Sequence, residues 1–82
     1  MKLLKKEIKR EIHKSRERFP AFHSHHEAYA VIKEEVDELW DWIKTNSSPT
    51  LKYNEVIQII AMCHCYIDEI LTDEISKESG ND

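Results

Sequence analysis

The sequence is poor in the residues that interrupt helices, with one Gly and two Pro among its 82 residues. This scarcity argues against a fold with many loops and favours a few long helices. No apolar run reaches the length of a membrane span, and none follows Leu3-Leu4 as a signal peptide would require. We therefore expect an all-α protein without a membrane segment, located in the cytoplasm.

Cysteine is also scarce, and Cys63 and Cys65 are two positions apart in a helical pattern. Side chains at that spacing point to nearly opposite sides of a helix, so the pair cannot easily form a disulfide or share a metal ion. We predict two buried free thiols in a reducing compartment. A domain this small has a modest core and often depends on a partner subunit, a metal or disulfides.

Charge is unevenly distributed along the chain, whose formal net charge is −4. That total argues against general nucleic-acid binding. Residues 1–19 nevertheless carry eight Lys/Arg against three Glu, whereas the remainder carries four Lys/Arg against thirteen Asp/Glu. The basic segment can pack over an acidic body or bind an anionic ligand, and DNA binding through it is the weakest of the three interpretations.

Hydrophobic periodicity divides the chain, one predicted domain over residues 1–82, into three helices and a tail. The predicted elements are a basic amphipathic helix at residues 1–19, motif-bearing helices at 24–44 and 50–71, and a polar tail at 72–82. Pro20 ends the first helix, and Ser24 with Glu27 fits a capping box for the second. A loop is expected at residues 46–49, and the tail is expected to fray or to form a short last turn.

The third predicted helix is apolar around most of its circumference. The apolar positions are Val56, Ile57, Ile59, Ile60, Met62, Cys63, Tyr66, Ile67 and Ile70. A helix of this kind must be buried on most sides, and the other two helices cannot cover it alone. We predict an antiparallel bundle of three main helices that is completed by oligomerisation, as a dimer or a tetramer. The alternative is that a further C-terminal turn covers the helix.

Two helices each place a carboxylate inside an apolar sector. At roughly 100° per residue, Glu35 falls on the apolar arc of the second helix, and Glu38 lies at the edge of that arc. On the third helix Glu55 falls among apolar residues, and Gln58 follows one turn later. A buried carboxylate is costly unless it is paired, protonated or bound to a metal. If the helices pack antiparallel, the two i, i+3 pairs face each other. Three carboxylates and one amide oxygen suit Mg²⁺ or Mn²⁺.

The alternative interpretation of these acids is structural. Glu34, Asp37 and Asp41 fall on the polar side of the second helix, where side chains are usually solvated. Glu35 can pair with a Lys or Arg of the first helix, which would give a buried ion pair and no chemistry. The helical pattern leaves both interpretations open.

The acids also form a motif. Residues 34–38 read E-E-V-D-E, which fits E-E-x-x-E, and residues 55–58 read E-V-I-Q on the next helix. Over residues 20–71 the chain resembles the MazG-like all-α nucleoside triphosphate pyrophosphohydrolases of the short phage and bacterial type, which carry E-E-x-x-E followed by E-x-x-D. The resemblance implies an oligomer that holds Mg²⁺ and hydrolyses a nucleoside triphosphate to the monophosphate and pyrophosphate.

The resemblance also implies roles for individual residues. Glu35, Glu38 and Glu55 would be metal ligands together with Gln58, and Glu34 would be an accessory catalytic carboxylate that orients a ligand or the attacking water. Gln58 departs from the family motif, since a neutral amide adds no negative charge and is a poorer Mg²⁺ ligand. The alternative function is therefore a non-catalytic helical oligomer for nucleotide sensing or protein contact.

Substrate-binding groups are expected outside the motif. The family's downstream helix, which supplies basic and amide residues, is short or missing, so the first helix would provide the cations. The candidates are Lys9, Arg10, Lys14 and Arg16, among which we assign Arg10 and Lys14. Trp42 lies on the carboxylate side and is a candidate for stacking on a nucleobase, although a Trp on an apolar arc is more often core.

Histidines gather at the start of the second helix, at His23, His25 and His26. A Zn²⁺ or Ni²⁺ site and an anion site at the helix N-terminus are functional alternatives. We favour a third interpretation, a capping segment that happens to be rich in His. His13 and His64 stand alone and are predicted to be surface or packed residues.

Overall fold

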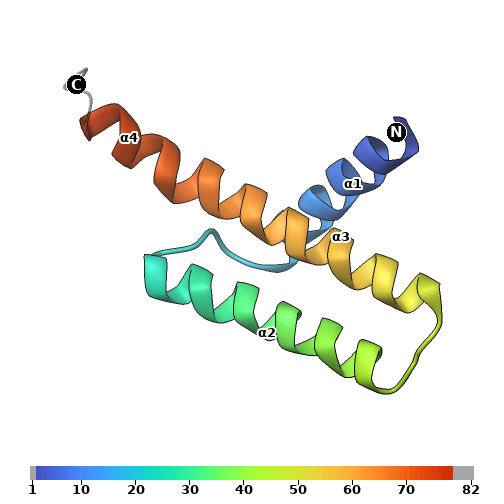
Figure 1. Ribbon diagram of the computed structural model, residues 1–82. Coiled ribbons are helices and arrows are strands. Elements are labelled where there is room, and N and C mark those ends of the chain that lie inside the picture. Colours follow the sequence, from blue (N-terminus) through green and yellow to red (C-terminus); the bar gives the residue numbers. More distant parts are fainter. Residues whose placement is uncertain (1, 79–82) are drawn as a thin grey trace.

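The computed structural model describes residues 2–78, and the secondary structure within that range is entirely helical (Figure 1). The elements are α1 (Lys2–Arg18), α2 (His25–Lys44), α3 (Pro49–Tyr66), the π-helical turn η1 (Ile67–Leu71) and α4 (Thr72–Glu78). The predicted all-α class is therefore confirmed. In the range described, no helix combines the length and the hydropathy that crossing a membrane requires.

Serine residues cap the starts of α2 and α3. The Ser24 hydroxyl accepts a hydrogen bond from the Glu27 amide at 3.1 Å, as the capping box predicts. The Ser48 hydroxyl accepts one from the Leu51 amide at 3.3 Å. In a capping box the Glu27 carboxylate would accept a hydrogen bond from the amide of Ser24. It accepts instead from the amide of His23, one residue earlier, at 2.7 Å.

The connection between α2 and α3 is shorter than predicted. Pro49 already belongs to α3, where its fixed φ suits the first helical position. Thr45 ends α2, and its amide donates to the Asp41 carbonyl at 3.1 Å. Asn46 follows with a φ of 54°, in the left-handed region that Asn tolerates better than most residues. One left-handed residue therefore reverses the chain.

The largest difference from the sequence prediction concerns the polar tail. Within the described range the helical path continues beyond Leu71 through α4, while residues 79–82 of the predicted tail lie outside that range. Polarity does not prevent this, because local bonds support the helix. The Thr72 hydroxyl donates to the Ile67 carbonyl at 2.8 Å, and Lys77 pairs with Asp73 at 3.1 Å.

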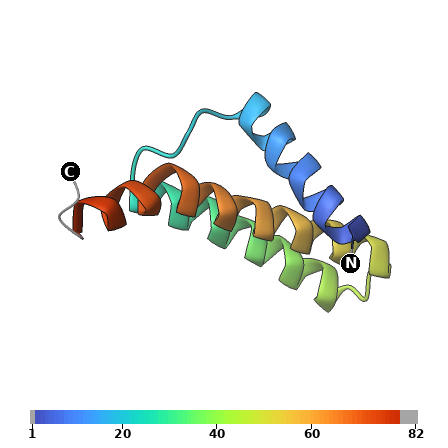
Figure 2. The ribbon, with the colours of Figure 1, turned by 90° about the horizontal axis from the view of Figure 1, so that it is seen from above.

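Helices α2 and α3 run antiparallel side by side, and α1 crosses α3 obliquely on one side of this hairpin (Figures 1 and 2). The buried apolar side chains are mostly small: Ala28, Ile57, Ala61 and Cys65. Helix α1 is attached near both of its ends. The Tyr53 hydroxyl donates to the Glu7 carboxylate, and Arg16 donates to Asp68. The core is small, as the chain length predicts.

The burial of the two cysteines shows which side of α3 is covered by α1. Both are free thiols; Cys65 is buried, as is the neighbouring Ser15 of α1, whereas Cys63 is half-buried. The predicted burial is therefore complete for Cys65 and partial for Cys63. The difference arises because α1 packs against only one side of α3.

The opposite side of the α2–α3 hairpin carries uncovered apolar side chains, which we name the apolar face. Its exposed members are Tyr29, Val36, Trp40, Ile43, Val56, Ile60 and Ile67. At about 100° per residue, the stripes on the two antiparallel helices point to the same side, away from α1. Trp40 is 56% exposed and Ile60 is 36% exposed. A single chain thus leaves this side of α3 without the cover that its apolar circumference requires.

Candidate metal centre

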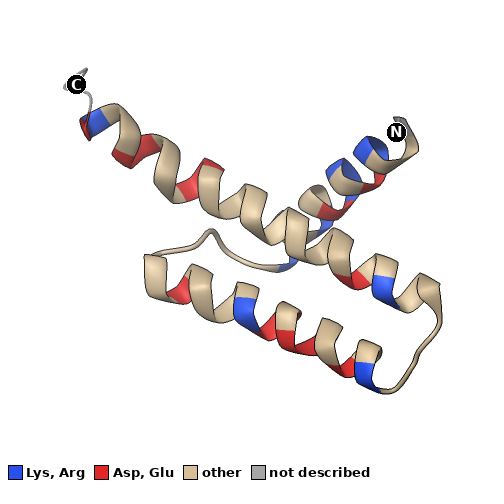
Figure 3. Cartoon of the chain, in the orientation of Figure 1, with Lys and Arg blue, Asp and Glu red and all other residues tan. Residues whose placement is uncertain are grey.

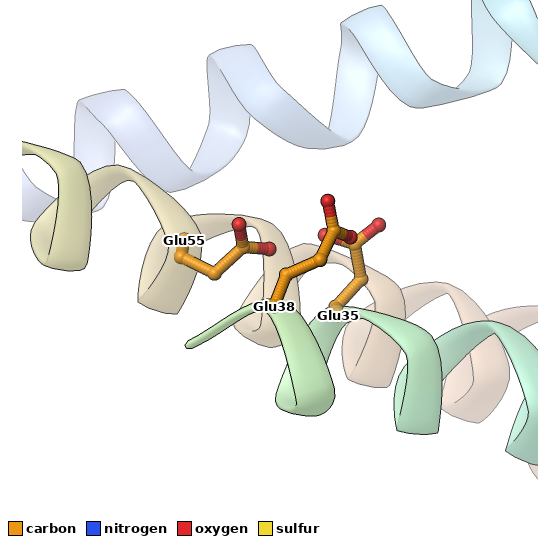
Figure 4. A group of neighbouring side chains, drawn as sticks. All are labelled: Glu35, Glu38 and Glu55. Atoms are coloured by element: carbon orange, nitrogen blue, oxygen red, sulfur yellow. The ribbon is translucent and has the colours of Figure 1, made fainter. Parts of the chain in front are cut away.

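The three predicted carboxylate ligands converge between α2 and α3. Glu35 and Glu38 lie one turn apart on α2, and Glu55 reaches toward them from α3, on the side past which α1 runs (Figure 4). One oxygen atom from each carboxylate lies within 4.8 Å of the others. Oxygen ligands on opposite sides of a Mg²⁺ ion are about 4.2 Å apart, so small side-chain rotations would place these atoms around one ion.

Two of these carboxylates hold oxygen atoms that lack a partner. Glu55 is only 5% exposed, and its Oε1 accepts a hydrogen bond from the Trp42 indole Nε1–H at 3.3 Å. While both side chains are ionised, the Oε2 atoms of Glu35 and Glu55 are buried and accept no hydrogen bond from any described residue. Orphaned buried oxygens of this kind are costly. A divalent cation between the helices would satisfy both, so the donor set fits such an ion.

The alternative to a metal site was that Glu35 forms a buried ion pair with a Lys or Arg of the first helix. Within residues 3–78, Glu35 forms no ion pair with Lys or Arg. Its neighbours are other acids. The pKa of Glu35 is raised to about 8, first by burial and then by a hydrogen bond that its protonated form makes to Glu55. Repulsion from the charges of Glu55, Glu38 and Glu34 raises this pKa further. Loss of solvent and repulsion from Glu55 also raise the pKa of Glu38. The cluster therefore favours a bound proton or a bound cation.

Gln58 lies beside this cluster, between two cavities. The larger, which we name the main groove, has a volume of about 380 Å³ and is lined by Gln58, Glu34 and Glu35 on one side. The smaller, which we name the basic groove after its two cations, has a volume of about 280 Å³ and is lined by Gln58, Arg10 and Lys14 and also by the carboxylates Glu7 and Glu11. The exposed Glu34 thus borders the main groove next to Glu35. Coordination by Gln58 and a catalytic role for Glu34 stay predictions.

The basic residues of α1 fall into two groups: one pairs with acids of the chain, and the other is left for an anionic ligand. Figure 3 shows Lys and Arg along α1 and a row of Asp and Glu along α2. Arg16 pairs with Asp68 and Glu69 and so fastens α1 to the acidic part of the chain. Arg10 and Lys14 form no ion pair with any residue from 2 to 78, and they line the basic groove. They are therefore available to an anionic ligand.

Aromatic side chains lie both at the carboxylate cluster and along the main groove. Trp42 is half-buried and lines neither groove, and its indole N–H is used in orienting Glu55. Its predicted stacking on a nucleobase stays a prediction. Phe19 and Phe22, by contrast, line the main groove. Neither residue was selected from the sequence, because Phe19 falls at the very end of the predicted first helix and Phe22 lies in the short connection after it, where no periodicity marks the direction of a side chain.

The histidines form no metal cluster in the part of the chain that the structure describes. The His25 ring nitrogens lie 2.8 Å from the Tyr66 hydroxyl and 2.9 Å from the Glu74 carboxylate. His23 lies 3.7 Å from Glu27. His25 therefore connects α2 to α3 and α4 as a packing group.

Comparisons of the chain with protein-family models, with curated proteins and with solved structures found no match. The geometry of the carboxylates and grooves is therefore what supports a function for this chain.

Proposed function

We propose that the chain is a Mg²⁺-dependent nucleoside triphosphate pyrophosphohydrolase of the MazG-like all-α type, with Mn²⁺ as a substitute metal. The observation that carries the proposal is the convergence of Glu35, Glu38 and Glu55 with two orphaned buried oxygens. These three carboxylates would hold the ion, with the Gln58 amide oxygen as a further ligand. When bound, the ion supplies neutralisation of phosphate charge and polarisation of the reacting phosphoryl group.

The chain's own residues have separate tasks in this proposal. Arg10 and Lys14 bind the β- and γ-phosphates in the basic groove, where no ion pair within the described range occupies them. Glu34, at the border of the main groove, orients the attacking water and takes up its proton. The water oxygen bonds to the α-phosphorus, the bond to the bridging oxygen breaks, and pyrophosphate leaves. Trp42 holds Glu55 in place through the indole N–H.

A second candidate function is a non-catalytic helical oligomer that senses nucleotides or contacts another protein. The observation that favours it is Gln58, which places a neutral amide where the motif has an acid. A site with one negative charge less binds a divalent cation more weakly.

Pyrophosphate release separates the two functions. We expect the full chain with Mg²⁺ or Mn²⁺ to release pyrophosphate, and no free phosphate, from at least one member of a panel of common and modified dNTPs and NTPs. A Glu35→Gln variant should release none, because it removes a metal ligand. Absence of release from the whole panel, by protein whose helical content and unfolding transition are normal, would leave only the non-catalytic function.

We also propose that the helical bundle is completed by a second copy of the chain through the apolar face. Two α2–α3 hairpins packed through these faces would form a four-helix core. The face is self-complementary in chemistry, since apolar side chains from both helices would meet their own copies across a two-fold axis. A tetramer would pair two such dimers.

Charges placed in the apolar face are expected to dissociate the oligomer. Wild-type protein should sediment as a dimer or tetramer, whereas Ile60→Glu and Trp40→Glu should each shift the equilibrium to monomer, because both side chains would be buried at the interface. Leu3→Glu is the matched control, since Leu3 is apolar and 76% exposed but lies on α1. Sedimentation equilibrium at micromolar concentration measures the mass. A wild-type monomer would refute the proposed interface.

A further inference from the structure

Residues 19–24, which we name the strap, connect α1 to α2 (Figure 2). Phe19, Pro20 and Phe22 line the main groove, and Phe19 is 62% exposed. The strap contains a proline and no glycine, so its backbone has little freedom once its ends are fixed.

One carboxylate ties the middle of the strap to the rest of the chain. The Phe22 amide donates to Glu69 Oε1 at 2.9 Å, and the Arg16 guanidinium lies 3.6 Å from Glu69 Oε2. The Glu69 side chain is 15% exposed, so solvent does not readily replace these contacts. Glu69 thus holds both the end of α1 and the strap. It sets the position of the Phe22 ring in the groove wall.

The π-helical turn brings the partners of His25, the residue that follows the strap, to one side of the helix. Tyr66 and Glu74 are eight residues apart, which in a regular α-helix leaves them about 80° apart around the axis. A π-turn contains one residue more than an α-turn and so rotates the following helix back by about 100°. Both side chains then reach His25, immediately after the strap. Glu69 lies within the turn itself.

The main groove and the basic groove lie on either side of Gln58 and differ in chemistry. The basic groove has the unpaired cations Arg10 and Lys14 beside Glu7 and Glu11. The main groove has carboxylates along one part of its lining and, elsewhere, an aromatic and apolar wall that includes Phe19, Phe22, Val31 and Met62. A ligand that carries a polyphosphate at one end and a planar ring at the other would match this arrangement. The ring would lie against the strap.

We propose that the strap is the wall that recognises the nucleobase, and that Glu69 is the residue that positions it. This inference rests on the proposed function, since it assigns one end of the same substrate. Glu69 acts through the backbone of Phe22 and touches no substrate. It is therefore a positioning residue, and its removal should affect ligands with a base more than ligands without one.

The test compares two probes that differ in the base. The first is a set of α,β-methylene deoxynucleoside triphosphates, which resist cleavage at the reacting bond, and the second is inorganic tripolyphosphate, both with Mg²⁺. We expect Glu69→Ala and Phe22→Leu to weaken nucleotide binding by about tenfold, the range for a lost base–aromatic contact, and tripolyphosphate binding by less than about twofold. Calorimetry on the full chain measures both affinities.

Two further variants make the test specific to the contact. Glu69→Gln keeps an oxygen that can accept from the Phe22 amide, so it should retain most of the nucleotide affinity that Glu69→Ala loses. Glu78→Ala, an exposed acid on α4, should change neither affinity. Amide exchange at Phe22 should quicken in Glu69→Ala and stay slow in Glu69→Gln.

The outcomes separate this inference from the proposed function. If wild-type protein binds tripolyphosphate but no nucleotide more tightly, the strap does not recognise a base, and the inference is overturned alone. An equal loss for both probes in Glu69→Ala, or unchanged nucleotide affinity in Phe22→Leu, overturns it as well. If wild-type protein binds neither probe with Mg²⁺, the proposed function itself fails, and this inference fails with it.

Discussion

Glu55→Gln is expected to weaken Mg²⁺ binding by about 100-fold or more, because even loss of a group that only supports a ligand costs about 10–100-fold. Glu55 is the most buried member of the cluster, and it alone brings a carboxylate from α3 to the pair on α2. Without it, one helix would have to hold the ion. Pyrophosphate release by Glu55→Gln should fall below detection together with the Mg²⁺ affinity. Calorimetric Mg²⁺ titration gives the affinity.

The same substitution should make the metal-free protein more stable. The amide nitrogen that replaces one Glu55 oxygen would donate to the Glu35 carboxylate, which has an orphaned buried oxygen, while the remaining oxygen still accepts from Trp42. Even replacing a whole buried ion pair by neutral side chains of similar volume is often neutral or stabilising, by up to about 4 kcal/mol, in other proteins. We expect a gain on the order of 1 kcal/mol here, measured by urea unfolding with EDTA.

A matched charge change elsewhere on α2 provides the control. Asp37→Asn removes one negative charge from an exposed residue that pairs with Lys33 at 2.9 Å. Neither Mg²⁺ affinity nor stability should change much, since exposed ion pairs contribute little. If Glu55→Gln and Asp37→Asn had the same effect, or if Glu55→Gln left Mg²⁺ affinity intact, the cluster would not be a metal site.

The stability of the metal-free protein is expected to fall as pH rises from about 4.5 to about 8. The pKa of Glu35 lies near 8 in the folded chain against an ordinary value of 4.5, so across this range the folded state binds more protons than the unfolded state. Stability decreases with pH wherever that is so. Glu38, whose pKa is also raised, contributes with the same sign. The folded state is favoured while Glu35 keeps its proton.

A bound cation should abolish this dependence. Mg²⁺ favours the ionised carboxylates, so at saturating Mg²⁺ stability should stay level or rise over the same pH range, and binding at pH 7 should release protons. Thermal unfolding at four pH values, with EDTA or with Mg²⁺, measures both curves. In Glu35→Gln the EDTA curve should lose most of its slope. A metal-free protein that becomes more stable toward pH 8 would contradict the raised pKa.

Local interactions explain why the helices themselves could be predicted. Helix α2 begins after Ser24, and its cap bond to the Glu27 amide involves only residues three apart. The placement of Glu35 and Glu55 within apolar sectors is a property of each helix separately, so periodicity was enough to select them. Predicting that they meet needed one further assumption, the antiparallel packing of α2 on α3, which the short loop favours.

Periodicity failed where the helix itself changes its period. The tail was expected to fray or to end in a short turn, but the π-turn and α4 extend the helical path to Glu78. Polar residues of such a segment give no apolar stripe, and a π-turn disturbs whatever stripe exists. The contacts of Glu69 with Phe22 and of Glu74 with His25 join residues 47 and 49 positions apart. No local pattern contains them.

The sequence by itself determined the helical class, the helix starts and the identity of the buried acids, because these depend on residues within a few turns of each other. The tertiary structure alone decided the environment of those acids. It showed that Glu35 lies among other carboxylates and not beside a lysine or arginine, that Arg10 and Lys14 remain unpaired within the described range while Arg16 does not, and that the strap forms a groove wall. Charge neighbours and cavities arise only when distant segments pack together, and a one-dimensional pattern does not contain those distances.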